Sequence, residues 1–103
     1  MKHYTYSAFK EQTGEAILSF PFITQYDDFQ VTVCPASGAS GDAKLLVKPQ
    51  GTPGFEPVYL WDEPVEFDLS EGQQTVQFNA SISQLKVDLT AASDAVDIIV
   101  GVR

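Results

Sequence analysis

Cysteine and histidine are almost missing from this sequence, and their scarcity excludes several kinds of site. Cys34 is the only cysteine, so these residues can form no internal disulfide and can supply neither a zinc tetrad nor a redox pair. Because it ends an apolar run, we interpret it as an inert, largely buried thiol. His3 is the only histidine, so a Ser-His-Asp or Cys-His arrangement would depend on a residue beside the N-terminus. We therefore expect no catalytic residues, no cofactor and no metal ion.

Long hydrophobic runs are also missing. Lys2 and His3 are not followed by the apolar stretch of a signal peptide, and no segment approaches the eighteen apolar residues that a membrane-spanning helix needs. We expect a chain that is made in a cytoplasm without a signal peptide and that has no membrane partner.

Basic residues are few and unevenly placed. Six Lys and Arg residues stand against fourteen Asp and Glu residues, a formal net charge of −8, which opposes binding to nucleic acid. One stretch, residues 56–71, contains no Lys or Arg. Its acidic residues are Glu56, Asp62, Glu63, Glu66, Asp68 and Glu71. A basic protein surface or a cation would suit this segment, and an ordinary solvated face is the alternative.

Alternation of apolar and polar residues is the main pattern that the sequence does contain, and Thr75 to Leu89 shows it best. Val76 and Phe78 fall on one face and Gln77 on the other, as in a half-buried strand. From Leu85 the apolar set continues one residue out of phase. We therefore predict two strands, with a bulge or tight turn at Ser83–Gln84.

Similar short runs recur along the chain, separated by turn residues, and no helix of ten residues is predicted. The runs are His3 to Lys10, Phe29 to Cys34, Lys44 to Lys48, Phe55 to Trp61, Val65 to Leu69 and Ala95 to Val102. We predict that the second and third form a hairpin, and that residues 1–10 are an edge strand or an extended N-terminal arm. With 44% hydrophobic residues in 103, the whole chain, 1–103, is expected to be a single domain. Eight or nine short strands favour an all-β, antiparallel β-sandwich, jelly-roll-like or immunoglobulin-like.

Aromatic residues gather near the N-terminus. Seven of the twelve lie within the first 29 residues, which is more than the end of a thin sandwich needs, so they fill the core or face a partner subunit. Tyr59 and Trp61 are predicted to share a strand face, as core, subunit contact or sugar-stacking platform. The candidate subunit or coat contacts are Tyr4, Tyr6, Phe9, Phe22, Tyr26, Tyr59 and Trp61.

From Phe29 onward the order of pieces resembles small all-β virion proteins of tailed bacteriophages, the group of head decoration (cement) proteins and fibre-type β domains. The resemblance covers about 70% of the chain. It lies in Val31 to Pro35, the small-residue loop Ala36 to Asp42, Leu45 to Pro49, Val65 to Ser70, Phe78 to Val87 and Val96 to Val102.

This resemblance implies a non-enzymatic structural protein of the virion. The first expectation is a capsid decoration protein that binds the major capsid protein and stabilises the shell. A fibre or tail domain of a phage and a small glycan-binding module are the alternatives. Cement proteins of this kind commonly sit at local threefold positions, so we also expect a homotrimer in which residues 2–29 supply much of the contact.

Overall fold

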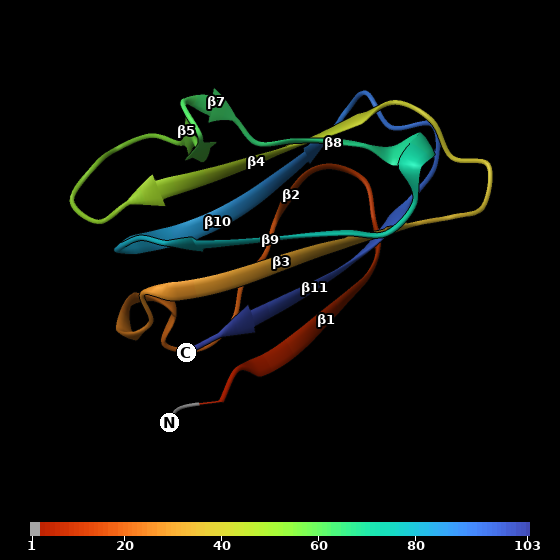
Figure 1. The fold of residues 1–103 in the computed structure, drawn as a ribbon. Helices are drawn as coiled ribbons and strands as arrows, with labels where there is room; N and C mark the ends of the chain where they lie inside the picture. The colour runs from red at the N-terminus through yellow and green to blue at the C-terminus, as the bar shows by residue number, and fades with distance from the viewer. Residues whose placement is uncertain (1–2) are drawn as a thin grey trace.

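The computed structural model describes residues 3–103 and is almost entirely β-structure (Figure 1). In the sheets that pack on each other, the strands are β1 (Thr5–Gln12), β2 (Gly14–Ile17), β3 (Asp28–Pro35), β4 (Asp42–Pro49), β5 (Glu56–Pro57), β8 (Glu66–Asp68), β9 (Gln74–Asn79), β10 (Ile82–Leu89) and β11 (Val96–Val102). A separate two-stranded pair consists of β6 (Tyr59–Leu60) and β7 (Glu63–Pro64), and there are two short 3₁₀ helices, η1 (Ile23–Gln25) and η2 (Leu69–Glu71). The all-β prediction is confirmed.

Two antiparallel sheets pack face to face. Sheet A has the strand order β1-β11-β3-β9, and sheet B has the order β2-β10-β4-β5, with β8 also pairing with β4. Strands β5, β6 and β7 have two residues each and are set aside here. Of the remaining eight, β1 and β3 lie in sheet A and β2 and β4 in sheet B. The order then reverses, with β8 and β10 in sheet B and β9 and β11 in sheet A. Eight strands arranged in this way are a jelly roll, the first of the two predicted sandwich types.

The core lies between the sheets and is formed by the inward-facing residue of every second position. In β3 these residues are Phe29, Val31 and Val33, all fully buried. Phe29 stacks on Phe78 of β9, with ring centroids 5.4 Å apart. Strand β11 contributes the set that alternation predicted, Val96, Ile98, Val100 and Val102.

The predicted hairpin between Phe29–Cys34 and Lys44–Lys48 is wrong. Strand β3 belongs to sheet A and β4 to sheet B, so the loop between them crosses from one sheet to the other. Alternation in each strand shows which side faces the core but not which strand is its neighbour. The loop after Pro35 is long enough for either connection, so the sequence did not distinguish them.

The stretch from Thr75 to Leu89 does form two strands, and they also lie in different sheets. The chain leaves β9 at Asn79 and crosses at Ala80–Ser81, so Ile82 already belongs to β10. The pairing of β10 with β4 shifts register between Ile82 and Gln84, so the predicted bulge exists, but it lies within β10; the division between the two strands is three residues earlier than predicted. This bulge keeps both Ile82 and Leu85 buried.

Cys34 is half-buried, not largely buried as predicted. Val31 and Val33 face the core, so Thr32 and Cys34 face outward from sheet A. The thiol donates a long hydrogen bond, 3.8 Å, to the side-chain oxygen of Gln73.

Candidate interaction surfaces

The most exposed aromatic residue in the described chain stands at the tip of a two-residue hairpin. Strands β6 and β7 pair Tyr59 with Pro64 and Leu60 with Glu63, so Trp61 and Asp62 form the turn. Both have positive φ, 56° and 64°. Turns of this kind favour Asn-Gly or Asp-Gly, because other side chains are strained in the left-handed region. The Trp61 side chain is 96% exposed, so no packing within the chain compensates for that strain.

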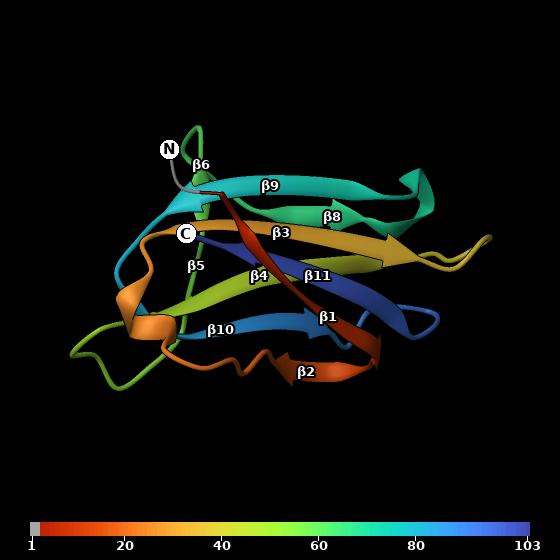
Figure 2. The same ribbon diagram turned by 90° about the horizontal axis from the view of Figure 1, so that it is seen from below.

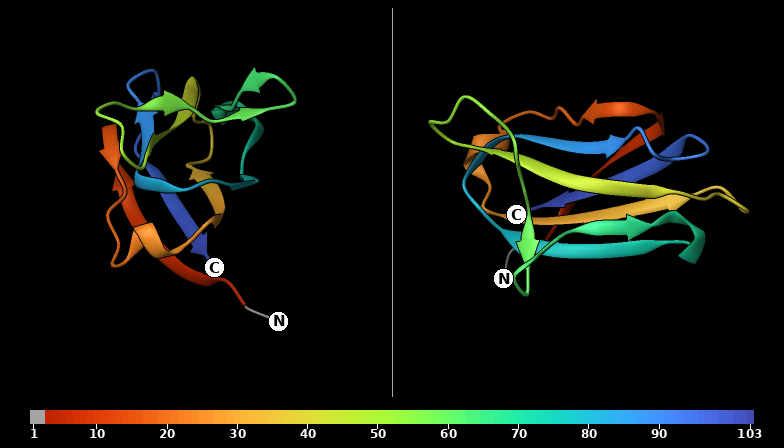
Figure 3. Two further views of the ribbon diagram at one scale, coloured as in Figure 1. Left: turned by 90° about the vertical axis from the view of Figure 1, so that its left-hand side faces the viewer. Right: turned by 90° about the horizontal axis from the view of Figure 1, so that it is seen from above.

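The base of this hairpin is held firmly while its tip projects. Val58 and Val65 are buried, and the Val65 amide donates to the Val58 carbonyl over 2.8 Å. The Val58 amide donates to Leu45 of β4, and the Leu45 amide donates to Val65. Figure 2 and the right view of Figure 3 show β6 extending sideways beyond β9, the edge strand of sheet A. Trp61 is therefore presented by a rigid support.

Acidic side chains outnumber basic ones around the hairpin. No Lys, Arg or His occurs between residues 49 and 85. Lys48 and Lys86, which border this stretch, lie over the Phe55 ring at 5.4 and 4.4 Å from its centroid. Lys86 also contacts the Glu15 carboxylate at 3.2 Å. Lys44 of β4 lies beside the base of the hairpin, next to Pro64 and Glu66, but the carboxylates of residues 56–71 are more numerous, so the hairpin side keeps a net negative charge.

An open groove of about 440 Å³ separates the base of the hairpin from the end of β9. One wall is Glu56 to Leu60, and the other is Gln77 to Ala80, with Val47 between them. Tyr59, 60% exposed, stands on the hairpin wall. The groove combines an aromatic ring with amide and carboxylate groups.

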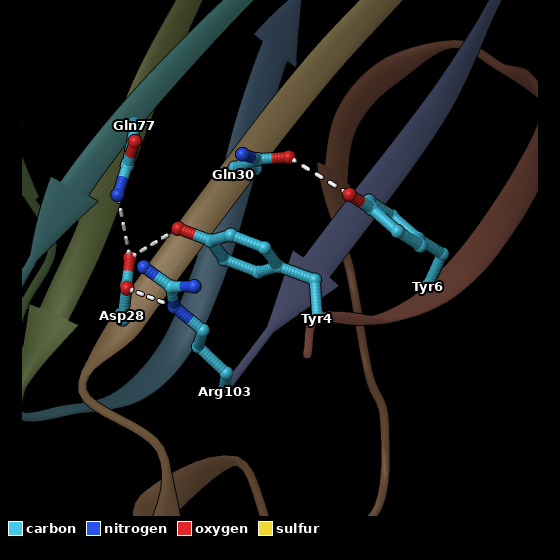
Figure 4. A network of polar contacts seen from close by, with 6 residues as sticks. All are labelled: Tyr4, Tyr6, Asp28, Gln30, Gln77 and Arg103. Atoms are coloured by element: carbon cyan, nitrogen blue, oxygen red, sulfur yellow. Dashed lines mark hydrogen bonds and ion pairs between the residues drawn. The ribbon is translucent and has the colours of Figure 1, made fainter. Parts of the chain in front are cut away.

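Tyr4 and Tyr6 lie on the outer face of sheet A, in the network of Figure 4. The Tyr4 hydroxyl donates to Asp28 Oδ1 at 2.7 Å, and Arg103 Nε donates to Asp28 Oδ2 at 2.6 Å. Gln77 also donates to Oδ1, at 3.2 Å. The Arg103 guanidinium lies 4.3 Å from the centre of the Tyr4 ring. The network fixes both ends of the described chain to the start of β3.

Both tyrosines can cross the sheet because β11 has a glycine beneath them. A Cβ atom on Gly101 would lie 2.7 Å from the Tyr6 ring and 3.3 Å from the Tyr4 ring. The Tyr6 hydroxyl then reaches Gln30 of β3, donating at 3.2 Å. Tyr6 nevertheless remains 59% exposed, so it can still contact a partner.

The Asp28 network shifts the pKa values of its members. The Tyr4 hydroxyl, followed by Arg103, stabilises the Asp28 carboxylate and holds its pKa below the ordinary value. Burial, followed by the hydrogen bond to Asp28, raises the pKa of the Tyr4 phenol. The hydrogen bond to Asp28 raises the pKa of Arg103. These shifts belong to a structural clamp in which every charged group has a partner.

The seven aromatic residues predicted as contacts do not form one surface. Tyr6, Phe22, Tyr59 and Trp61 are exposed, whereas Tyr4, Phe9 and Tyr26 are half-buried. Phe9 and Tyr26 pack against the core, so they serve the fold of the monomer. Phe22 is 68% exposed and has φ 60° beside η1, which Figure 1 places away from the hairpin. The rings of Tyr4 and Tyr6 lie close together, with centroids 6.0 Å apart, and Tyr59 and Trp61 belong to the same hairpin.

Sequence reasoning missed the groove and the Asp28 network. Residues 56–60 and 77–80 line the same groove from distant parts of the sequence, and Tyr4, Asp28 and Arg103 meet only through strand pairing. The sequence does place Asp28 on the outward face of its strand, because Phe29, Val31 and Val33 alternate inward. The structure shows that this outward-facing carboxylate is nevertheless buried.

Two of the carboxylates considered for a cation, Glu66 and Asp68, have neighbours of their own. Glu66 of β8 stands opposite Lys44 of β4, and Asp68 accepts hydrogen bonds from the amide and hydroxyl of Ser70 at the start of η2. Among residues 3–103, no three His, Cys, Asp or Glu side chains are grouped so that they could hold a metal ion. Within the same residues, no helix has the length and apolar character needed to cross a membrane.

Comparison with known proteins yields a likeness of fold. No protein-family model and no curated protein matches the sequence. A solved chain from Bacillus endospore appendages, which are described as a novel family of disulfide-linked pili, is similar with a TM-score of 0.56 and 12% identity. The match covers 97% of this chain and 82% of that one. At such low identity it supports the β architecture alone.

Proposed function

We propose that this protein is a non-enzymatic structural component of a phage virion, a capsid decoration protein that binds the major capsid protein and stabilises the shell. In this proposal the β6–β7 hairpin is the element that docks on the coat. The jelly roll is a fold of many viral capsid domains, which supports the proposal by analogy. The negative potential around the hairpin favours a basic surface on the coat subunit.

The observation that carries the proposal is Trp61. A residue with positive φ at a hairpin turn costs stability, and this one is 96% exposed, so it buries almost nothing in the molecule. Tryptophan is among the residues that contribute most at protein interfaces, where it fills a pocket in the partner. The backbone strain at Trp61 is not offset by packing within the molecule. Such a residue is expected where its side chain contacts a partner.

Two matched variants test the docking role. Trp61→Gly and Phe22→Gly each remove an exposed aromatic side chain from a positive-φ position, and glycine relieves the strain in both. We expect both to melt at or slightly above the wild-type temperature. Only Trp61→Gly should lose affinity for capsids, by roughly 30-fold, which is the effect of losing an interface residue worth about 2 kcal/mol. Equal binding by all three proteins would contradict docking through the hairpin.

Cryo-electron microscopy of particles made with and without the gene for this chain tests the virion assignment. Density over the whole head is expected for a decoration protein. Density confined to the tail or one vertex would replace decoration by the fibre or tail alternative. Particles that lack the protein altogether would overturn the virion role.

A glycan-binding module is the second candidate, and the groove beside Tyr59 favours it. An exposed aromatic ring next to Gln77, Asn79 and Glu56 offers a stacking face together with hydrogen-bonding groups, as sugar sites require. Saturable binding to a glycan array that is lost in Tyr59→Ser would support this candidate. A blank array at millimolar sugar would remove it.

We also propose a homotrimer. Of the N-terminal aromatics, Tyr6 retains enough exposed ring to form a subunit contact. The similarity to a pilus subunit does not extend to disulfide linkage. A polymer joined by disulfides needs two cysteines in each subunit, and the 103 residues of this sequence contain one. Light scattering behind size exclusion should give a trimer mass at tens of micromolar. A monomer mass would contradict an obligate trimer.

A further inference from the structure

The edges of the two sheets differ in how they are protected against pairing with another strand. Natural edge strands carry charges, prolines, bulges or very few residues, and each of these discourages an added strand. In β1, Lys10 and Glu11 stand where the pairing with β11 shifts register, between Phe9 and Gln12. Among the described edges of sheet B, β2 has four residues and contains Glu15, β5 contains Pro57, and β8 has three residues, two of them acidic.

Strand β9 has none of these protections. Its six residues, Gln74–Asn79, include no charge, proline or glycine, and they pair with β3 in an unbroken register from Val33 to Asp28. On its other side β9 has no strand partner, and within residues 3–103 its backbone makes no further backbone hydrogen bond there. The free amide and carbonyl groups of β9 therefore form a ready template for another strand.

The hairpin adds a wall beside this template. The 440 Å³ groove runs between Glu56–Leu60 and residues 77–80, which are the last part of β9 and the turn after it. Figure 3 shows the hairpin reaching past β9, so a strand added at this edge would lie between β9 and the hairpin base. Tyr59 and Trp61 would then cover it from the hairpin side.

We propose that β9 is a strand-addition site, and that an extended segment of a partner protein, bearing apolar and basic side chains, pairs with its free edge beneath the hairpin. This inference rests on the docking role proposed above and gives that role its binding mode. Main-chain hydrogen bonds to β9 supply affinity, and alternate side chains enter the groove.

Charge selects the partner. Glu56 lines the groove, and Asp62 and Glu63 belong to the same hairpin, so carboxylates outnumber the one basic side chain, Lys44, that is described beside the hairpin base. Lysine or arginine side chains on the added strand meet these carboxylates. The β9 edge of a second copy would instead bring its own carboxylates toward them, in a chain whose net charge is −8.

The experiment uses the full chain, labelled with ¹⁵N, and a synthetic peptide, acetyl-Lys-Val-Thr-Val-Lys-Val-Lys-amide. Because Trp61 is the only tryptophan and follows Leu60, a residue of the groove wall, its fluorescence reports on binding beside the hairpin. We expect saturable binding, a blue shift of Trp61 emission, and slowed hydrogen exchange of the β9 amides that face the edge. The same peptide N-methylated at alternate residues keeps its side chains but loses donors, and it should bind at least about tenfold more weakly.

Charge variants complete the test. Replacing lysine by glutamate in the peptide should abolish binding. Glu56→Lys should lower the affinity for the lysine peptide at least about tenfold. Glu71 lies in η2 and outside the groove, so Glu71→Lys should leave that affinity unchanged.

Four outcomes would overturn strand addition. They are equal binding by the N-methylated peptide, peptide-induced protection in β1 but not in β9, dimerisation through β9 without any peptide, and capsid attachment that depends on Trp61 while β9 amides remain unprotected. The last outcome leaves the docking role standing. Conversely, the peptide could protect the β9 amides while electron microscopy finds the protein on no particle. That result would uphold strand addition and overturn only the virion role.

Discussion

Gly41 offers the sharpest test of how the loops at one end of the sandwich meet. Its φ is 93°, and a Cβ atom placed there would overlap the carbonyl oxygen of Ala91 and lie 3.2 Å from the Ala92 Cα. The approach is supported by three hydrogen bonds of 2.9 Å: Ser93 amide to Ser40 carbonyl, Ser40 amide to Ser93 hydroxyl, and Leu69 amide to Gly41 carbonyl. A side chain at residue 41 must push these loops apart.

The matched position is Gly38 in the same loop. Its φ is 81°, and a Cβ atom there would meet nothing within 4 Å. Gly38→Ala should therefore cost only the left-handed strain, about 1 kcal/mol. Gly41→Ala should add the loss of up to three hydrogen bonds at about 1 kcal/mol each, for a total of roughly 3 to 4 kcal/mol.

Thermal unfolding followed by circular dichroism separates the two variants. At about 4 to 8 °C per kcal/mol for a domain of this size, Gly41→Ala should melt more than about 12 °C below the wild type, and Gly38→Ala less than about 8 °C below it. Urea titration gives the free energies directly. If the two variants lose the same stability, the 36–41 loop does not approach the 90–95 loop this closely in solution.

The remaining predictions concern the core and the Asp28 network. Phe78→Ser should lower the free energy of unfolding by roughly 3 to 5 kcal/mol, because it removes a buried ring that stacks on Phe29 and buries a hydroxyl; an unchanged urea midpoint would contradict the β9 register. Hydrogen bonds lower the pKa values of Asp28, Asp68 and Asp88, so their stabilising effect is complete above the unfolded pKa of about 3.9 and is lost as the pH falls through the lower folded values. The melting temperature should accordingly drop below about pH 4, less steeply in Asp28→Asn, and identical pH profiles for the two proteins would exclude Asp28 from this effect. Tyr4→Phe removes the largest contribution to the Asp28 shift, so carboxyl NMR should find the Asp28 pKa raised toward the ordinary value; no change would mean that Tyr4 does not donate to it in solution.

Features that depend on neighbours along the chain could be predicted from the sequence. Alternation in β11 placed Val96 and Ile98 in the core correctly, and the phase slip after Ile82 located a real bulge, because side chains on a strand point alternately to its two faces. The same reasoning misjudged Cys34, whose position after Val33 already implied an outward direction.

Pairing between distant strands could not be predicted, and most of the candidate site depends on it. Phe29 contacts Phe78 and Tyr4 contacts Asp28 across sequence separations that no local pattern encodes. The β3–β4 connection was predicted as a hairpin because alternation does not show which strands are neighbours. Trp61 was expected on a strand face because its neighbours are β-formers, and its residue type carries no turn signal.

The sequence by itself therefore determined the all-β class, the inward face of the main strands and the acidic character of residues 56–71, since composition and alternation are local properties of the chain. Only the tertiary structure decided that Trp61 is exposed at the tip of a hairpin, that β9 is an open edge, and that the base of the hairpin and the end of β9 line one groove. The physical reason is that burial and edge exposure result from which strands pair, and many pairings are compatible with the same alternating pattern.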